Sequence, residues 1–96
     1  MERPGLAGCG ADELNSPNSA ELLANGHILI ADEANNRVIE VNRNKQIVWS
    51  YGSCTGGQLN GTAFASRLPN GQTLINDSDN HRILAVTAAK KDCVRL

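Results

Sequence analysis

The hydrophobic positions of the chain fall into short runs separated by polar, turn-forming residues. Residues 28–31, Ile-Leu-Ile-Ala, are apolar at successive positions rather than at alternate ones. Because a sheet with one face in water alternates apolar and polar side chains, a continuous run indicates a strand that is covered on both faces. Asn-Gly pairs and β-branched residues interrupt every window of helical length, so we predict an all-β chain.

Two Asn-Gly pairs, Asn25-Gly26 and Asn70-Gly71, are strong turn signals. Both positions of such a pair tolerate positive φ, so each pair predicts a two-residue hairpin and gives Gly26 and Gly71 a structural role. Polar turns elsewhere complete a pattern of short strands. We expect strands at residues 19–24, 27–32, 37–42, 47–51, 64–69, 72–77, 82–87 and 92–96.

The chain is an internal repeat with an offset of 45 residues. Without any gap, Leu29 meets Leu74 and Asp32 meets Asp77, and the correspondence continues from about residue 7 to the C-terminus. A fixed period sustained in this way is typical of repeat architectures. We divide the chain into an N-terminal segment and connector at 1–13, a first blade at 14–52, a connector at 53–58 and a second blade at 59–96.

Four strands per repeat, joined by hairpins and covered on both faces, favour a blade of a β-propeller. A solenoid is the main alternative, although four strands in each repeat fit a blade better. A blade buries both faces only between two neighbours, so two blades alone would leave apolar faces open. We expect those faces around Leu29, Val38, Val41, Leu74, Ile83 and Val86.

Polar residues at fixed places in both repeats resemble the blades of NHL-repeat propellers. In that family an apolar strand that follows an Asn-Gly or Asp-Gly turn ends in Asp, and Asn-x-Arg precedes the third strand. The matching residues are Asp32, Asn35 and Arg37, and again Asp77, Asn80 and Arg82.

The segment Ile47-Val48-Trp49 also resembles blades of arylsulfotransferase-type propellers. NHL-type blades also have a proline in the first strand, and Pro17 is the matching residue here. The second repeat departs from both patterns, since Thr62 stands in place of Pro17 and Asp92-Cys93-Val94 in place of Ile47-Val48-Trp49.

The resemblance implies a ring of six blades. Propellers commonly have four to eight blades, and a head-to-tail interface that closes forms a ring. Two-blade subunits can therefore close as a dimer, trimer or tetramer, and we expect a homo-oligomer that is a trimer.

Asp32 and Asp77 each close a strand, and Arg37 and Arg82 begin the strands that follow. Because the pair recurs in both repeats, we interpret it as structural. The Asp would accept backbone N–H bonds of the following turn, and the Arg would bridge to that Asp or to a neighbouring blade. A catalytic acid–cation pair is the alternative. We predict no catalytic residue and no metal site, since residues 77–80 lack the EF-hand spacing that calcium would favour.

The predicted strand directions place the turns after the second and fourth strands on one face of the ring. That face is acidic and rich in amides, and we take it as the candidate surface for a protein or small-molecule ligand. Its candidate ligand-binding residues are Asp32, Glu33, Asn35, Asn36, Asp77, Asp79, Asn80 and His81. The opposite face carries Arg43, Lys45, Lys90 and Lys91.

Three other residues that could contact a ligand are interpreted as structural. His27 is expected to flank a turn at the surface, and Trp49 and Tyr51 are expected to pack at the periphery rather than to form a ligand platform.

The three cysteines are an odd number and do not suggest a disulfide framework. Cys9 and Cys54 lie in equivalent connectors, which a propeller would hold more than about 7 Å apart, so we expect free thiols. Cys93 replaces Val48 and is predicted to be buried.

Composition narrows the classes of function. Nine basic and ten acidic residues give a net charge of −1, without the basic excess of a nucleic-acid binder. No apolar run approaches the roughly 18 residues that span a bilayer, so we expect no membrane partner. We recognise no signal peptide, which favours a cytoplasmic location, and we expect no cofactor.

We therefore expect a non-enzymatic binding or scaffold module. One alternative is a fragment of a six-bladed propeller enzyme, of the lyase or lactonase type, with a metal near the central axis. Another is a structural fragment or engineered duplication without a selected ligand.

Overall fold

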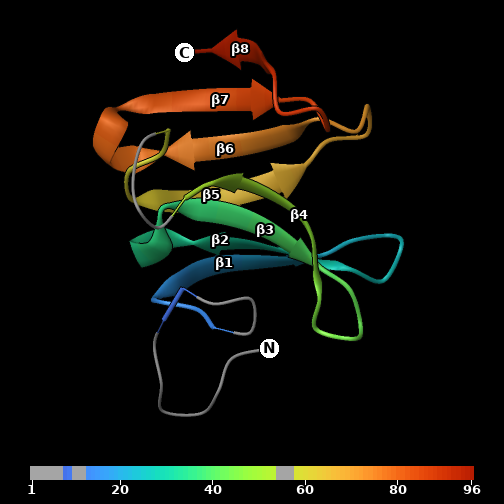
Figure 1. Cartoon of the computed structure of the whole chain (residues 1–96). Coiled ribbons are helices and arrows are strands. Elements are labelled where there is room, and N and C mark those ends of the chain that lie inside the picture. The colour runs from blue at the N-terminus through green and yellow to red at the C-terminus, as the bar shows by residue number, and fades with distance from the viewer. Residues whose placement is uncertain (1–7, 10–12, 54–57) are drawn as a thin grey trace.

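Two four-stranded antiparallel sheets make up the fold (Figure 1). The structure, a computed structural model, describes residues 8–9, 13–53 and 58–96. The first sheet contains β1 (Pro17–Leu22), β2 (Ile28–Asp32), β3 (Arg37–Val41) and β4 (Ile47–Gly52). The second contains β5 (Thr62–Arg67), β6 (Thr73–Asp77), β7 (Arg82–Val86) and β8 (Asp92–Arg95). Strands that follow one another in sequence are neighbours in each sheet.

The prediction of an all-β chain is confirmed, and each expected strand is present with ends that differ by at most two residues. Helical structure in the described residues is confined to two short 3₁₀ turns, η1 (Glu33–Asn35) and η2 (Ser78–Asn80). Each connects the second strand of its sheet to the third. Both turns end on a residue in the left-handed region, Asn36 and His81, with φ of 53° and 55°.

The two Asn-Gly hairpins are longer than predicted. Backbone hydrogen bonds from Leu23 N to His27 O and from Gly26 N to Leu23 O enclose a three-residue loop, residues 24–26. Only the glycine adopts positive φ, +87° in Gly26 and +89° in Gly71. The loop is thus a turn followed by a left-handed glycine, the usual three-residue hairpin, rather than the two-residue form. Asn25 still contributes, because its Oδ1 accepts the N–H of His27.

The sheets stack face to face, with β5 lying against β1 and β2 (Figure 1). The core between them contains, from the first sheet, Leu29, Ala31, Val38 and Tyr51, and from the second part of the chain, Leu59, Ala65, Ile75, Leu84 and Val86. The outer side of the first sheet carries a second cluster of Leu14, Ile30, Ile39 and Val41.

This packing corrects the predicted positions of open apolar faces. Leu29, Val38 and Val86 are buried between the sheets, and Val41 is buried in the second cluster. Of the six residues expected at open faces, Leu74 is partly buried and Ile83 alone is exposed.

The polar and basic turns lie at opposite ends of the strands. Antiparallel pairing puts η1 and η2 at the end where β1 and β5 begin, on the left in Figure 1. The hairpin tips that carry Arg43, Lys45, Lys90 and Lys91 lie at the other end. The predicted strand directions therefore agree with the topology.

Gly52, at the end of β4, has φ of +90° and no room for a side chain. A Cβ there would overlap the carbonyl oxygen of Asn36 and lie 2.9 Å from Cδ1 of Leu59.

Gly71 has nearly the same φ, +89°, but a Cβ on it would meet nothing within 4 Å, so it is a matched control. We expect Gly71→Ala to lower the free energy of unfolding by about 1–2 kcal/mol through backbone strain, and Gly52→Ala by about 1–3 kcal/mol more through overlap. Urea unfolding of both variants measures the difference, and equal losses would contradict the expected clash.

Candidate functional site

A buried aspartate in the first sheet binds three donors from separate parts of the chain. Oδ1 of Asp32 accepts the backbone N–H of Asn15 at 2.8 Å. Its Oδ2 accepts Nδ2 of Asn35 and Nε of Arg37, each at 2.8 Å. Nη2 of Arg37 also donates to the carbonyl of Glu13 at 2.7 Å. We call this arrangement of an aspartate with its three donors the Asp clasp.

The second sheet repeats the Asp clasp. Oδ1 of Asp77 accepts the N–H of Asn60 at 2.7 Å, and its Oδ2 accepts Nδ2 of Asn80 at 2.8 Å and Nε of Arg82 at 2.6 Å. Arg82 also donates to the carbonyl of Gln58. The contact expected between Asp and Arg is therefore present in both sheets.

The expected cap on the following turn is wrong. Neither Asp32 nor Asp77 makes a side-chain cap to η1 or η2. The backbone donor of each clasp is instead Asn15 or Asn60, in the segment just before the first strand of the sheet. Each carboxylate thus ties that segment to the turn and to the third strand.

The clasps remove several candidate ligand-binding residues from the surface. Asp32, Asn35 and Asp77 are buried, and Asn35 also donates to the carbonyl of Gly8. Asn36 and Glu33 are partly buried. The candidates left exposed are Asp79, Asn80 and His81, all on or beside η2.

A hollow of about 350 Å³ lies next to these exposed residues. His81, Ser78 and Arg82 line it on one side. The apolar side chains of Ile83 and Leu96, with Asn76, complete it on the outer face of the second sheet. The predicted polar surface is therefore reduced to one turn that adjoins an apolar face.

A polar cluster joins the two sheets at the other end of the strands. Glu40, on β3, accepts Nη2 of Arg67 at 2.9 Å and is 2.6 Å from Nδ1 of His27. The backbone N–H of Arg67 donates to Glu21 at 2.9 Å. The Arg67 guanidinium lies 5.6 Å from the centre of the Trp49 ring, within cation–π range. The cluster therefore joins β1, β3 and β4 to β5 across the interface.

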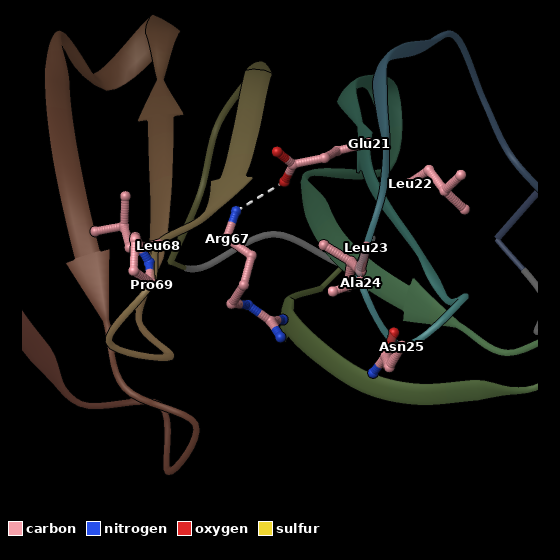
Figure 2. Close-up of a pocket in the computed structure, with 8 residues that line it drawn as sticks. All are labelled: Glu21, Leu22, Leu23, Ala24, Asn25, Arg67, Leu68 and Pro69. Atoms are coloured by element: carbon pink, nitrogen blue, oxygen red, sulfur yellow. Dashed lines mark hydrogen bonds between the residues drawn. The ribbon is translucent and has the colours of Figure 1, made fainter.

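Part of the cluster lines a groove of about 440 Å³ between the first hairpins of the two sheets. Figure 2 shows Glu21 and Arg67 facing one another across it, with Asn25 at its edge. Leu23, Leu68 and Pro69 supply apolar walls. Because each charged group in this groove already has partners within the chain, its chemistry favours joining the sheets.

The environment of Glu40 changes its ionisation. Burial raises the pKa of Glu40, but hydrogen bonds from His27 and Arg67 and the positive charge of Arg67 outweigh that effect. The pKa of Glu40 therefore lies below its usual value, and the carboxylate is charged near neutral pH.

Trp49 and Tyr51 also join the two sheets. Trp49 Nε1 donates to the carbonyl of Ala88 at 2.9 Å, and the Tyr51 hydroxyl is 3.1 Å from Oδ1 of Asp92. Their rings stack with centroids 6.5 Å apart. The interpretation as packing residues agrees with these contacts, although the packing lies between the sheets rather than at the periphery.

Sequence reasoning missed Glu40 and Arg67 as interacting residues and described His27 only as a turn-flanking residue. The sequence feature that could have indicated them is a difference between the two repeats. Ala85 corresponds to Glu40, and Leu22 corresponds to Arg67. A charge in one copy and an apolar residue in the other marks a position with a different neighbour in each copy.

The structure also corrects the cysteine predictions. Cys9 is disulfide-bonded rather than a free thiol, and Cys93 is free but exposed rather than buried. Cys54 and the central part of the 53–58 connector lie outside the described residues, as does most of the 1–13 segment.

Neither a metal-ligand cluster nor a membrane-spanning helix occurs in the described part of the chain. No group of three or more His, Cys, Asp or Glu side chains there is placed to hold a metal ion. Within the same residues, no helix is long and apolar enough to cross a membrane.

Comparison with known proteins places the fold but not an activity. No protein-family model and no curated protein matches the chain. Among twelve matching chains of solved structures is the crystal structure of a protein of unknown function from Bacteroides caccae. It has a TM-score of 0.70 and 20% sequence identity over 88% of this chain. The match covers 36% of that chain, so this protein spans about a third of its neighbour's length.

The Asp clasps predict a stability defect when either carboxylate is removed. Asp32→Ala would leave Arg37 and two other donors without their acceptor, and we expect it to lower the free energy of unfolding by about 3–5 kcal/mol. Asp77→Ala should cost less, because the Arg82 side chain is 21% exposed and that of Arg37 is 9% exposed. Thermal melting measures both.

Asp79→Ala is the matched control, since Asp79 is an exposed acidic residue of η2 that takes no part in a clasp. It should melt like the parent. If Asp32→Ala and Asp77→Ala also melt like the parent, the structural interpretation is wrong and the polar turns become the first candidates for a binding site.

The low pKa of Glu40 predicts a specific acid sensitivity. Because folding lowers that pKa below 4.5, the stabilisation is complete above this pH and is lost as the pH falls through the lower folded value. Near neutral pH, Glu40→Gln should be less stable than the parent by about 1.5–3 kcal/mol, the usual contribution of hydrogen bonds to charged groups. Urea unfolding across the acid range should show the two proteins converging. Parallel pH profiles would mean that Glu40 does not stabilise the fold through its charge.

Proposed function

We propose that this protein is a non-enzymatic binding or scaffold module whose two sheets are blades of a β-propeller, completed by further copies of the chain. Six blades, and hence a homotrimer, is the arrangement that the NHL-type blade pattern favours. Assembly precedes ligand binding, because a surface for a ligand would be completed only when the blades close.

The supporting observation is an apolar face without a covering sheet. On the first sheet, Val38 and Tyr51 are buried against the second sheet. The corresponding residues of the second sheet, Ile83 and Leu96, are 40% and 79% exposed. Exposed apolar patches of this kind typically mark an interface. A third sheet, stacked as the second is stacked on the first, would cover it.

Two further observations agree with a larger assembly. The two sheets share their strand order and their Asp clasp, so the unit is suited to continued stacking. The chain also matches only about a third of the longer Bacteroides caccae protein, so the two-sheet unit accounts for part of that larger fold.

A ligand surface would form at the end of the strands where η1 and η2 lie. Ring closure would gather one such pair of turns from each copy around the same face. The exposed residues Asp79, Asn80 and His81 supply oxygen acceptors and an imidazole, which suit a polar small molecule or a protein loop with donor groups. We place the binding function on this turn.

We expect the purified chain to have three times the mass of one copy in solution. Static light scattering during size-exclusion chromatography measures that mass directly. A dimer or tetramer would keep the ring but change its number of blades. A folded monomer that persists at high concentration would overturn the proposal and favour a structural fragment or engineered duplication instead.

A further inference from the structure

The interface between the two sheets depends on residues that the repeat does not conserve. At its centre, Nη2 of Arg67 donates to Oε1 of Glu40 at 2.9 Å, and Nε of Arg67 donates to the Thr73 hydroxyl at 3.0 Å. The offset of 45 residues identifies the positions that correspond to these three in the other copy. They are Leu22 for Arg67, Ala85 for Glu40 and Ile28 for Thr73.

Leu22 and Ile28 form an exposed apolar pair on the outer side of the first sheet. They are register partners across β1 and β2, as Arg67 and Thr73 are across β5 and β6. Leu22 is 76% exposed and Ile28 is 39% exposed. Figure 2 shows Leu22 turned away from the second sheet, whereas the side chain of Arg67 extends toward the first. The outer face therefore carries an apolar version of the inner contact.

The outer side of the second sheet has the complementary feature. Ala85 stands where the first sheet has Glu40, and exposed Ile83 and Leu96 stand where it has Val38 and Tyr51. Ala85 itself is only 3% exposed, so it forms the floor of a shallow apolar surface whose exposed parts are the side chains of Ile83 and Leu96. This surface has Ala85 in place of a carboxylate, so it could not pair with an arginine. The residue that would face it, at position 22, is accordingly leucine and not arginine.

We propose that copies of this chain dock head to tail with Leu22 of one copy over Ala85 of the next, in the place that Arg67 takes over Glu40 within the chain. This inference rests on the proposed propeller assembly and specifies its contact. The exposed apolar residues of the outer face lie at the β1–β2 hairpin, because Ile30, Ile39 and Val41, further along that face, are already buried.

A hydrogen bond between a side chain and a backbone N–H at the other end of the strands supports the same stacking. Within the chain, Oδ1 of Asn36 accepts the N–H of Gly61 at 3.0 Å. The corresponding pair is His81 and Ser16. These residues adopt the same left-handed conformations, with φ of 55° for His81 and 54° for Ser16, against 53° and 65° for Asn36 and Gly61. In the docked assembly, the His81 ring would accept the N–H of Ser16 from the neighbouring copy.

The difference between the inner and outer contacts also fixes the order of the blades. If Leu22 were seated against Glu40, the carboxylate would be buried without its arginine. If Arg67 were seated against Ala85, the guanidinium would be buried without a carboxylate. Unpaired buried charges are strongly unfavourable, so each face accepts only its own partner.

The test exchanges the apolar contact for the polar one. Leu22→Arg alone and Ala85→Glu alone should each weaken assembly by about 10–100-fold in dissociation constant, because each buries an unpaired charge. The double variant Leu22→Arg with Ala85→Glu recreates the Arg67–Glu40 pair between copies and should assemble within about threefold of the parent. Light scattering over a dilution series measures assembly, and circular dichroism confirms that each variant is folded.

Asn44→Arg is the matched control, since it adds the same charge at an exposed position in the turn between β3 and β4, outside the proposed contacts at Leu22 and Ser16. It should assemble like the parent. If Ala85→Glu does not fold, the reversed pair, Leu22→Glu with Ala85→Lys, tests the same rescue.

The outcomes separate the two proposals. A monomeric parent overturns both the propeller assembly and its contact. If the parent assembles but Leu22→Arg has no effect, or neither double variant recovers assembly, the assembly stands and the Leu22–Ala85 contact is overturned.

Discussion

The buried carboxylate of the Asp clasp is the interaction on which each sheet depends. Asp77 fixes the N–H of Asn60, and the residue just before it, Leu59, lies in the core between the sheets. Asp32 fixes Asn15 in the same way, next to Leu14 in the second cluster. A carboxylate suits this position because its two oxygens accept several hydrogen bonds at once, and Arg37 or Arg82 balances its charge. One side chain thus places a connector, a turn and an apolar core residue together.

Positions at which the two repeats have the same residue and positions at which they differ have different structural roles. The clasp residues agree because every sheet needs its connector held in the same place. Glu40 and Arg67 disagree with Ala85 and Leu22 because these positions face different neighbours in the two copies. In this chain, the clasp residues that agree hold each sheet together, and the differing residues Glu40 and Arg67 form the polar contact between the sheets.

The strands and the candidate site were predictable to different extents. Apolar runs and turn residues are local signals, so the strands were predicted well. The hairpin length was predicted wrongly because an Asn-Gly pair fits both a two-residue turn and the last positions of a three-residue loop. The polar residues of η1 and η2 were found, but their exposure depends on long-range bonds, such as that from Asn15 to Asp32 across 17 positions. The pairing of Glu40 with Arg67 joins residues 27 positions apart in different sheets, and only the comparison of the two copies could have indicated it.

The contact between the two sheets of one chain is polar, and the proposed contact between copies is apolar. This difference follows from how the two contacts are formed. The two sheets of one chain are held near each other by their connector, so their contact does not have to offset the loss of free translation and rotation. A network around Glu40 can therefore fix their register even though a buried ion pair adds little stability beyond that of an apolar pair of the same size. A contact between separate copies must offset that loss, which apolar burial does more effectively. The proposed seating of Leu22 and Ile28 on Ala85 and its neighbours has the composition that this constraint favours.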